Sequence, residues 1–381
     1  MKIKTATITF QASHNCGSLL QAYALQQTII AMGYDNEIIN FANNGSREMY
    51  SILPPIHPLR RGIRGRLNYW FKSLFYYSII KRQYIYYESF IKKNLKLTPK
   101  QYKSNEELQK EKFDYTHYIT GSDQVWNTCC HDADSAYYLD FVKNGKKIAY
   151  AVSTGATQIA EKVQNIEFYK KLILEIDFLS VREQNAVIQF EKLTGRNDIE
   201  LLIDPTLLFT QKDWEEHFDL SKPIVKEDYI FYYAFHYSPK VNQIVKEISK
   251  RLNLPVYIIE AKAWGPRGCH KEGFKLCNSS GPETFLNLIK FAKLSLTTSF
   301  HGTVFSVIFK KTFWFIDSDM HNPMDDRAAT LVNQLGLPER LLLGEELIKK
   351  DFMQQPNYTH VNERIAQLQN QAKKFLTKAL Q

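Results

Sequence analysis

Hydrophobic residues recur along this chain in two patterns: short apolar runs typical of buried strands, and longer stretches with the spacing of amphipathic helices. The first unit predicts a strand at residues 3–10, a helix at 18–32 and a second strand at 36–41, with Gly33 ending the helix. A strand, a helix and a strand in succession form a crossover between parallel strands. This opening therefore predicts a parallel sheet.

The same alternation continues along the chain in two series, separated by a polar, Pro-containing stretch at residues 220–228. The first series predicts further strands at 115–120, 147–151, 178–181 and 200–203. The second predicts strands at 229–235, 256–260, 294–298 and 313–316 and helices at 239–252, 282–292 and 302–309. The sequence thus predicts an α/β protein of two Rossmann-like domains that face each other across a ligand-binding cleft.

The predicted domains span residues 1–220 and 221–355, and a helical segment at 356–381 follows them. Its amphipathic helix at 361–380 is expected to cross back to the first domain. A chain of 381 residues is long enough for two separate cores, and its 44% hydrophobic and 23% charged residues are typical of globular proteins.

Neither an export signal nor a membrane span is predicted. The alternating pattern of residues 1–10 lacks the apolar core of a signal peptide, and no window approaches about eighteen uncharged apolar residues. The five cysteines form no CxxC pair, which favours a reducing compartment, so we expect a cytoplasmic protein. Cys129, Cys130 and His131 are zinc-binding residue types, but adjacent cysteines rarely point at one ion, and no metal is expected.

The formal charge of +9 is concentrated in an insertion predicted at residues 55–112. Residues 60–97 hold ten Lys and Arg against one acid, Glu88, together with ten aromatic residues. This composition suits an anionic lipid surface, here the inner face of the cytoplasmic membrane. Two aromatic-rich helices packed on the neighbouring domain explain it equally well. No nucleic-acid-binding motif accompanies the charge, so we expect no nucleic acid partner.

Two loops at predicted strand ends are candidate acceptor-binding segments. Asn15 and Gly17 precede the first helix, where free N–H groups attract an anion, although a plain N-cap by Ser18 is the alternative. The second loop, after the strand at 115–120, offers small, acidic, amide and aromatic groups typical of a sugar site. Its alternative is an Asx-type turn with the tryptophan in the core. Its candidate residues are Ser122, Asp123, Gln124 and Trp126.

Arg182 and His301 also follow predicted strands. Arg182 is placed to bind phosphate or carboxylate, and a surface ion pair with Glu183 or Glu191 is the alternative. His301 stands between a strand and a helix and is expected to point into the cleft, whereas a lone histidine is more often structural. Asp204, in an Asp-Pro pair, is interpreted as a turn at the domain junction.

Taken together and in this order, five segments resemble the polysaccharide pyruvyl transferases. They are NCGSLLQAYALQ, YITGSDQVWN, SVREQNAV, DPTLLF and GPETFLNLIKFAKLSLTTSFHGTVFSVIF. The resemblance covers nearly the whole chain and is weakest in the insertion and the tail. It implies a two-domain fold similar to GT-B glycosyltransferases.

The resemblance also implies a reaction. Phosphoenolpyruvate would be the donor and co-substrate, and a hexose diol of a surface or capsular polysaccharide precursor, free or linked to polyprenyl diphosphate, would be the acceptor. The product would be a pyruvate ketal, commonly on O4 and O6 of galactose or a related sugar, with release of phosphate. No metal or redox cofactor is chemically required.

The resemblance assigns roles to several residues. His301 matches the family's essential histidine and would protonate C3 of the donor, and Arg182 matches the family's arginine. Asp123 is a candidate base from its loop position only. Many relatives carry Arg at the position of Ser299 and Lys near that of His321, so the donor site of this chain must differ from theirs. The replacement candidates are His321, Arg327, Lys310 and Lys311.

Two other functions remain open from the sequence. Two facing α/β domains with a basic cleft also suit a GT-B glycosyltransferase that uses a sugar nucleotide. A non-enzymatic polysaccharide-binding protein at the membrane surface would bind saccharide without releasing phosphate.

Overall fold

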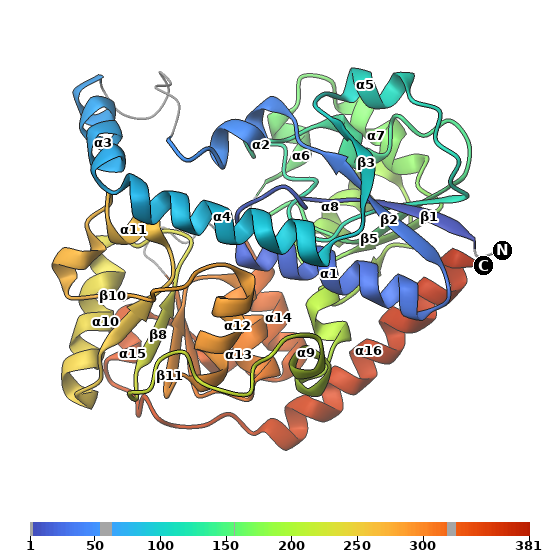
Figure 1. Cartoon of the computed structure of the whole chain (residues 1–381). Coiled ribbons are helices and arrows are strands. Elements are labelled where there is room, and N and C mark those ends of the chain that lie inside the picture. Colours follow the sequence, from blue (N-terminus) through green and yellow to red (C-terminus); the bar gives the residue numbers. More distant parts are fainter. Residues whose placement is uncertain (1–2, 54–62, 156, 318–324) are drawn as a thin grey trace.

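The computed structural model of the chain describes residues 3–53, 63–155, 157–317 and 325–381. Its first sheet has the order β3-β2-β1-β4-β5-β6-β7, and every pairing is parallel (Figure 1). The central strands β1, β4, β5 and β6 are buried on both faces, as in doubly wound sheets. The strands of this sheet are β1 (Lys4–Ile8), β2 (Asp35–Phe41), β3 (Leu97–Tyr102), β4 (His117–Thr120), β5 (Lys146–Val152), β6 (Phe178–Val181) and β7 (Glu200–Leu201).

The second sheet repeats this topology with the order β10-β9-β8-β11-β12-β13, again with parallel pairing. The two sheets lie on either side of the polar stretch at residues 220–228, so each belongs to its own Rossmann-like domain. The strands are β8 (Ile230–Tyr233), β9 (Val256–Ile258), β10 (Lys275–Leu276), β11 (Leu294–Thr297), β12 (Phe313–Asp317) and β13 (Leu341–Leu343).

Helices cover the faces of both sheets, as parallel strand crossovers require. In the first domain they are α1 (Cys16–Ala31), α2 (Asn44–Met49), α3 (Ile63–Phe75), α4 (Tyr77–Asn94), α5 (Asn105–Lys110), α6 (Ile159–Lys162), α7 (Ile166–Leu174), α8 (Gln184–Thr194) and α9 (Gln211–His217). In the second domain they are α10 (Pro239–Leu252), α11 (Ala261–Trp264), α12 (Pro282–Phe291), α13 (Phe300–Ile308), α14 (Arg327–Leu335) and α15 (Gly344–Leu347).

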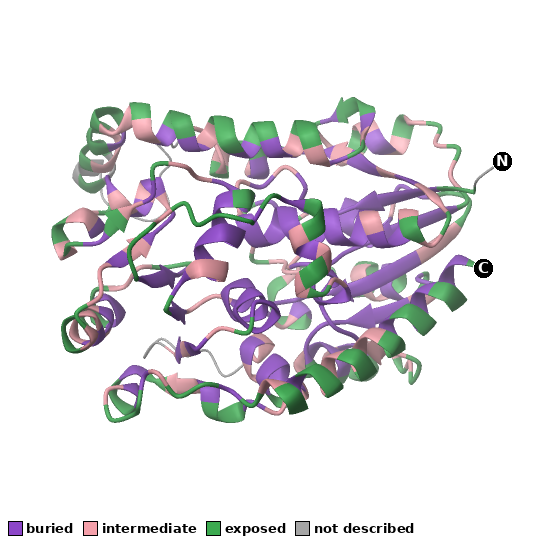
Figure 2. Cartoon of the chain, turned by 60° about the horizontal axis from the view of Figure 1, so that its bottom comes forward, coloured by how far each residue is buried: buried purple, intermediate pink, exposed green. Residues whose placement is uncertain are grey.

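Helix α1 is buried on nearly every side, and Figure 2 shows buried residues concentrated in the strands and the central helices. One apolar cluster joins Leu19 and Leu20 of α1 to Phe285 and Leu286 of α12. Burial of this shared apolar surface stabilises the arrangement of the two domains.

The last helix, α16 (Tyr358–Leu380), leaves the second domain and runs along the first (Figure 1). The hydroxyl of Tyr34 donates a hydrogen bond to the carbonyl of Leu380 at 2.7 Å. The side-chain amide of Gln369 donates to the carbonyl of Leu207, also at 2.7 Å. This helix thus crosses back to the first domain, as its apolar face predicts.

The insertion is shorter than the predicted residues 55–112. β3 lies within that range and pairs with β2, so it is an integral edge strand of the first sheet. Its sequence LTPKQY was missed because it contains Pro99 and Lys100, which sheets tolerate at an edge. Within the described residues, the insertion proper consists of α3 and α4.

Helix α4 bridges the two domains. The side chain of Gln83 donates to the carbonyl of Ile259 and accepts from the backbone N–H of Ala261, both at 3.0 Å. Its buried residues recur with helical spacing on the face that packs against the protein: Ile80, Gln83, Tyr87 and Phe90. For α4, the alternative of an aromatic-rich helix packed on the neighbouring domain is correct.

Candidate active site

The candidate active site lies where the carboxyl ends of both sheets meet. Asp123 follows β4, and Arg182 and Asp204 follow β6 and β7 in the first domain. His301 follows β11 in the second domain. The strand order reverses between β1 and β4 in the first sheet and between β8 and β11 in the second. α/β proteins bind ligands at such points.

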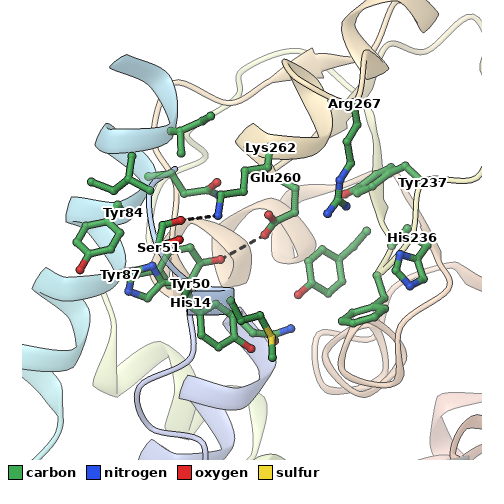
Figure 3. Close-up of a pocket in the computed structure, with 18 of the residues that line it drawn as sticks. His14, Tyr50, Ser51, Tyr84, Tyr87, His236, Tyr237, Glu260, Lys262 and Arg267 are labelled. Atoms are coloured by element: carbon green, nitrogen blue, oxygen red, sulfur yellow. Dashed lines mark hydrogen bonds between the residues drawn. The ribbon is translucent and has the colours of Figure 1, made fainter. Parts of the chain in front are cut away.

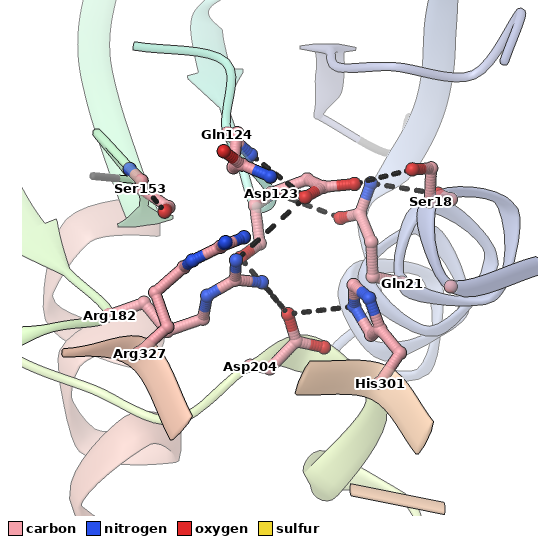
Figure 4. Close-up of polar contacts among 12 residues, drawn as sticks. Ser18, Gln21, Asp123, Gln124, Ser153, Arg182, Asp204, His301 and Arg327 are labelled. Carbon is pink, nitrogen blue, oxygen red and sulfur yellow. Dashed lines mark hydrogen bonds and ion pairs between the residues drawn. The ribbon is translucent and has the colours of Figure 1, made fainter. Parts of the chain in front are cut away.

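Asp204 connects the two domains through its carboxylate (Figure 4). Arg182 donates from Nη1 to Oδ2 of Asp204 at 2.6 Å. Nε2 of His301 lies 3.4 Å from the same oxygen. Asp204 is 1% exposed and Arg182 2%, whereas His301 is 7% exposed. An arginine and a histidine from different domains thus share one buried carboxylate.

The charge of this carboxylate depends on its two partners. Burial by itself would raise the pKa of Asp204, but His301 and Arg182 together hold that pKa well below its usual value. Asp204 therefore remains ionised. The backbone N–H and hydroxyl of Thr206 also donate to Oδ1 of Asp204, at 3.0 Å and 2.6 Å.

The guanidinium of Arg182 is held on several sides. It stacks 4.1 Å from the ring centroid of Phe300, and Nη2 lies 3.8 Å from a carboxylate oxygen of Asp123. Nε and Nη2 have no hydrogen-bond partner among the described residues. The expected alternative of an ion pair with Glu183 is correct in its partner, since Nε lies 4.0 Å from Oε2 of Glu183. The pair is buried instead of lying on the surface, and the shorter contact is with Asp204.

Gly17 forms the surface against which the His301 ring packs. A Cβ atom at residue 17 would lie 2.2 Å from Nδ1 of His301. Any side chain at this position would displace the ring. Gly17 is therefore required for the position of His301, and its assignment to acceptor binding stays a prediction.

Asp123 belongs to the same cluster. It accepts a hydrogen bond from the hydroxyl of Ser18, and its other oxygen accepts from the backbone N–H of Gln124 at 2.9 Å. Asp123 is 6% exposed and faces Arg182. Its carboxylate is thus engaged in holding the cluster, which weakens its candidacy as a base.

Arg327 brings a second guanidinium beside Arg182 (Figure 4). Its Nε and Nη2 donate to the two carboxylate oxygens of Asp325 at 2.7 Å and 2.6 Å. Its side chain is 20% exposed, so it is more accessible than that of Arg182. Two arginines of the kind that bind anions bidentately therefore lie together near His301.

A cavity of about 210 Å³ opens beside this cluster (Figure 3). Its lining includes Asn15 and Ser299, which lie two residues before Gly17 and His301 in the sequence. Both domains and α4 contribute tyrosines and charged groups to the wall. They include His14, Tyr50, Tyr84, Tyr87, Tyr233, His236, Tyr237, Glu260, Lys262 and Arg267.

Two charged groups in this cavity have perturbed pKa values. Burial raises the pKa of Glu260, which accepts a long hydrogen bond of 3.5 Å from the hydroxyl of Tyr87. Burial lowers the pKa of Lys262, whose ammonium donates to the carbonyl of Ser51 at 2.8 Å. Perturbed groups in a cavity favour a functional site.

Several predicted site residues lie elsewhere or have other partners. Trp126 is fully buried, stacks on Tyr138 and donates from its indole to the carbonyl of Tyr137, so the core alternative is correct. Ser122 is also fully buried and donates to the carbonyl of Ala151. The Ser122 hydroxyl also lies 3.3 Å from Oδ2 of Asp204, so this residue borders the cluster. Gln124 is half-buried, and its side-chain oxygen accepts from Asn127.

The first turns of α1 and α13 also differ from expectation. Asn15, rather than Ser18, is the N-cap of α1 and occupies the N–H groups of Gly17 and Ser18. These two N–H groups are therefore not available to an anion. His301 lies in the first turn of α13 instead of preceding the helix, and Ser299 is the N-cap.

The two lysines that were candidates for binding the donor lie away from the cluster. Lys310 and Lys311 follow the carboxyl end of α13, whereas His301 is in its first turn, about 13 Å away along the axis. Lys311 donates to the carbonyl of Lys290. Both are excluded from the cluster by the length of the helix. His321 lies outside the described residues.

The sequence interpretation missed two groups. Asp204 was assigned to a turn, although an acid directly after a buried strand of a parallel sheet is a signal for a site. Glu260 has the same signal, since it follows the apolar run at residues 256–259. The cavity tyrosines of α4 could not be assigned, because the spacing alone does not show what the helix faces.

These features define a two-domain α/β protein of the GT-B type with a charged site between its domains. Within that class, the chain belongs to the polysaccharide pyruvyl transferase family, whose model matches residues 15–320. Among curated proteins, none matches this chain.

Solved structures with low sequence identity share the fold. UDP-N-acetylglucosamine 2-epimerase from Rickettsia bellii has a TM-score of 0.50 and 10% identity, covering 99% of this chain and 97% of its own. UDP-GlcNAc 2-epimerase from Methanocaldococcus jannaschii, in complex with UDP-GlcNAc and UDP, has a TM-score of 0.49 and 14% identity, covering 97% of this chain and 100% of its own. The E. coli heptosyltransferase WaaC with ADP has a TM-score of 0.40 and 12% identity, covering 96% of this chain and 100% of its own.

The contact between Gly17 and His301 predicts a specific double-mutant result. Gly17→Ala should lower the free energy of unfolding by about 1–3 kcal/mol, because the added methyl group displaces the imidazole. In a His301→Ala background the same change should cost much less. Urea unfolding of the four proteins measures this coupling, and equal costs in both backgrounds would show that the ring is not the cause.

Glu183 predicts a pH dependence of stability. Burial raises its pKa to about 7, although Arg182 opposes the shift. Between about pH 4.5 and 7 the folded protein holds a proton that the unfolded chain releases, so this group makes stability fall as pH rises through that window. Glu183→Gln should remove this component and flatten the decline in Tm. Glu191→Gln, on the exposed face of α8, is the control, and parallel profiles for Glu183→Gln and wild type would contradict the prediction.

Proposed function

We propose that this protein transfers a pyruvyl group from phosphoenolpyruvate to two hydroxyls of a hexose, with release of phosphate. The sugar would be galactose or a related hexose, ketalised at O4 and O6, in a precursor of a surface or capsular polysaccharide. Family membership supports the transfer of pyruvyl groups to polysaccharide. The observation that carries the proposal is the meeting of His301 with Asp204 and Arg182 across the domain boundary.

His301 supplies the proton that starts the reaction. The C2–C3 double bond of the donor takes this proton at C3, which becomes a methyl group and leaves C2 electron-poor. Asp204 acts as a positioning residue, because its ionised carboxylate lies 3.4 Å from Nε2 of His301 and orients the imidazole. An acceptor hydroxyl then attacks C2, the C2–O bond to phosphate breaks, and the second hydroxyl closes the ketal.

The two arginines bind the anionic donor. Arg327 is the more exposed and replaces in function the arginine that relatives carry at the position of Ser299. Nε and Nη2 of Arg182 make no hydrogen bond to the described residues and lie 4.0 Å and 3.8 Å from carboxylates of Glu183 and Asp123. These two nitrogens are the candidate donors to phosphate or carboxylate. In this mechanism the cations neutralise the leaving phosphate, so no metal ion or redox cofactor is chemically required.

The tyrosine-lined cavity binds the acceptor. Aromatic faces and hydroxyls suit the apolar and polar faces of a hexose, and the cavity reaches Ser299 beside His301. Glu260 is a better candidate base than Asp123, because it lines this cavity and burial raises its pKa, which makes its carboxylate more basic. The acceptor is free or linked to polyprenyl diphosphate.

Ligand-induced stabilisation separates this function from its rivals. Phosphoenolpyruvate should raise the Tm of the protein, whereas UDP- and ADP-sugars should leave it unchanged. Incubation with phosphoenolpyruvate and a panel of free and lipid-linked galactosides should then add the mass of a pyruvyl ketal. Stabilisation by a sugar nucleotide instead would favour a glycosyltransferase, and saccharide binding without phosphate release would favour a binding protein.

Substitutions at the cluster test the roles of its residues. His301→Gln should slow phosphate release at least 100-fold while the Kd for phosphoenolpyruvate changes only a few fold. Asp204→Asn should also reduce kcat and should alter the pH profile of kcat, which a purely structural change would not. His360→Gln, on the exposed surface of α16, is the control. Wild-type turnover in His301→Gln would exclude this histidine as the acid.

A further inference from the structure

Helix α3 exposes a stripe of large apolar side chains. Leu67, Phe71, Leu74 and Phe75 are 41%, 61%, 47% and 82% exposed. Their spacing of four, seven and eight residues from the first places them on one face of the helix. Large apolar groups gathered on one exposed face mark an interaction surface, because burial of that face would be favourable.

The orientation of α3 is fixed by the corner where it joins α4. Tyr76 packs against Gly265 of the second domain, where an added Cβ would lie 2.6 Å from the tyrosine ring. The same ring contacts Trp264, with centroids 6.0 Å apart, and its hydroxyl lies 3.4 Å from Nε2 of His270. Figure 1 shows α3 at the edge of the molecule, beyond this corner. The stripe is therefore presented by an anchored helix.

The charge around the stripe is positive. The sequence of α3 contains no acid, and the sequence of α4 contains only Glu88. Lys72 on α3 and Lys81 and Arg82 on α4 are exposed. Lys81 and Arg82 lie beside the exposed Ile85 around a shallow surface depression. Basic residues next to exposed aromatic and aliphatic groups match a surface that is anionic outside and apolar beneath.

We propose that the face formed by α3 and the exposed side of α4 docks onto an anionic lipid surface. Phe71 and Phe75 enter the boundary between headgroups and acyl chains, and the basic residues bind lipid phosphates. No helix in the described part of the chain is long and apolar enough to cross a bilayer. The contact proposed here is peripheral and does not depend on pyruvyl transfer.

Docking through this face would also place the cavity near the membrane. Tyr84 and Tyr87 of α4 line the cavity, while Lys81, Arg82 and Ile85 of the same helix are exposed on its other side. One helix thus separates the lipid surface from the cavity wall. An acceptor carried on a lipid would reach the cavity over a short distance.

Sedimentation with vesicles tests the proposal on the full-length protein. Wild type should bind vesicles of phosphatidylcholine with about one third phosphatidylglycerol at least tenfold more tightly than pure phosphatidylcholine, and added salt should weaken this binding. Phe71→Ser with Phe75→Ser should weaken binding at least tenfold, as should Lys81→Gln with Arg82→Gln.

Matched controls remove equivalent groups elsewhere. Leu174→Ser with Ile188→Ser removes two exposed apolar side chains from α7 and α8. Lys373→Gln with Lys374→Gln removes two exposed charges from α16. Both controls should bind vesicles like wild type, and circular dichroism should show that all variants fold.

Three outcomes would overturn the proposal. Wild type could fail to bind anionic vesicles, or the α3 variants could bind as tightly as the controls. A wild-type dimer that Phe71→Ser with Phe75→Ser converts to monomer, without vesicle binding, would assign the face to a second copy of the chain. None of these readouts involves phosphoenolpyruvate or phosphate release, so they fail or succeed independently of the proposed activity.

Discussion

The buried carboxylate of Asp204 is the interaction on which the site depends. It follows the last short strand of the first sheet, and it binds Arg182 from the same domain and His301 from the other. A buried charge of this kind is tolerated only when its partners are held in place. The domains must therefore keep one relative position for the cluster to exist. The apolar cluster that α1 shares with α12 stabilises that position.

Close approach of backbone and side chain gives the site its geometry. Gly17 lets the imidazole of His301 lie against the start of α1, and Phe300 covers one face of the Arg182 guanidinium. Both contacts come from the first turn of α13, where Ser299 caps the helix. The capped first turn of α13, in the second domain, therefore positions the two side chains that contact the first domain.

The insertion joins structural and surface roles in two helices. Gln83 ties α4 to the backbone of the second domain, and Tyr84 and Tyr87 of the same helix complete the cavity wall. α3 packs at its carboxyl end through Tyr76 and exposes its apolar stripe beyond that point. The packing explanation holds for the buried side of α4. The lipid-facing surface that we propose consists of α3 and the exposed side of α4.

The sequence by itself determined the central strands and helices and their order, because strand and helix periods depend on which side of each element is buried. It missed the short or polar edge strands β3, β10 and β13. The sequence also placed Arg182 and His301 at strand ends, since parallel strands place all their carboxyl ends at one edge. Only the tertiary structure decided which of these groups meet. Asp204 reads as a turn and Trp126 as a sugar-binding residue until their neighbours are known. Which residues far apart in sequence come into contact depends on how the two sheets pack against each other. The local periodicity of the sequence does not contain that information.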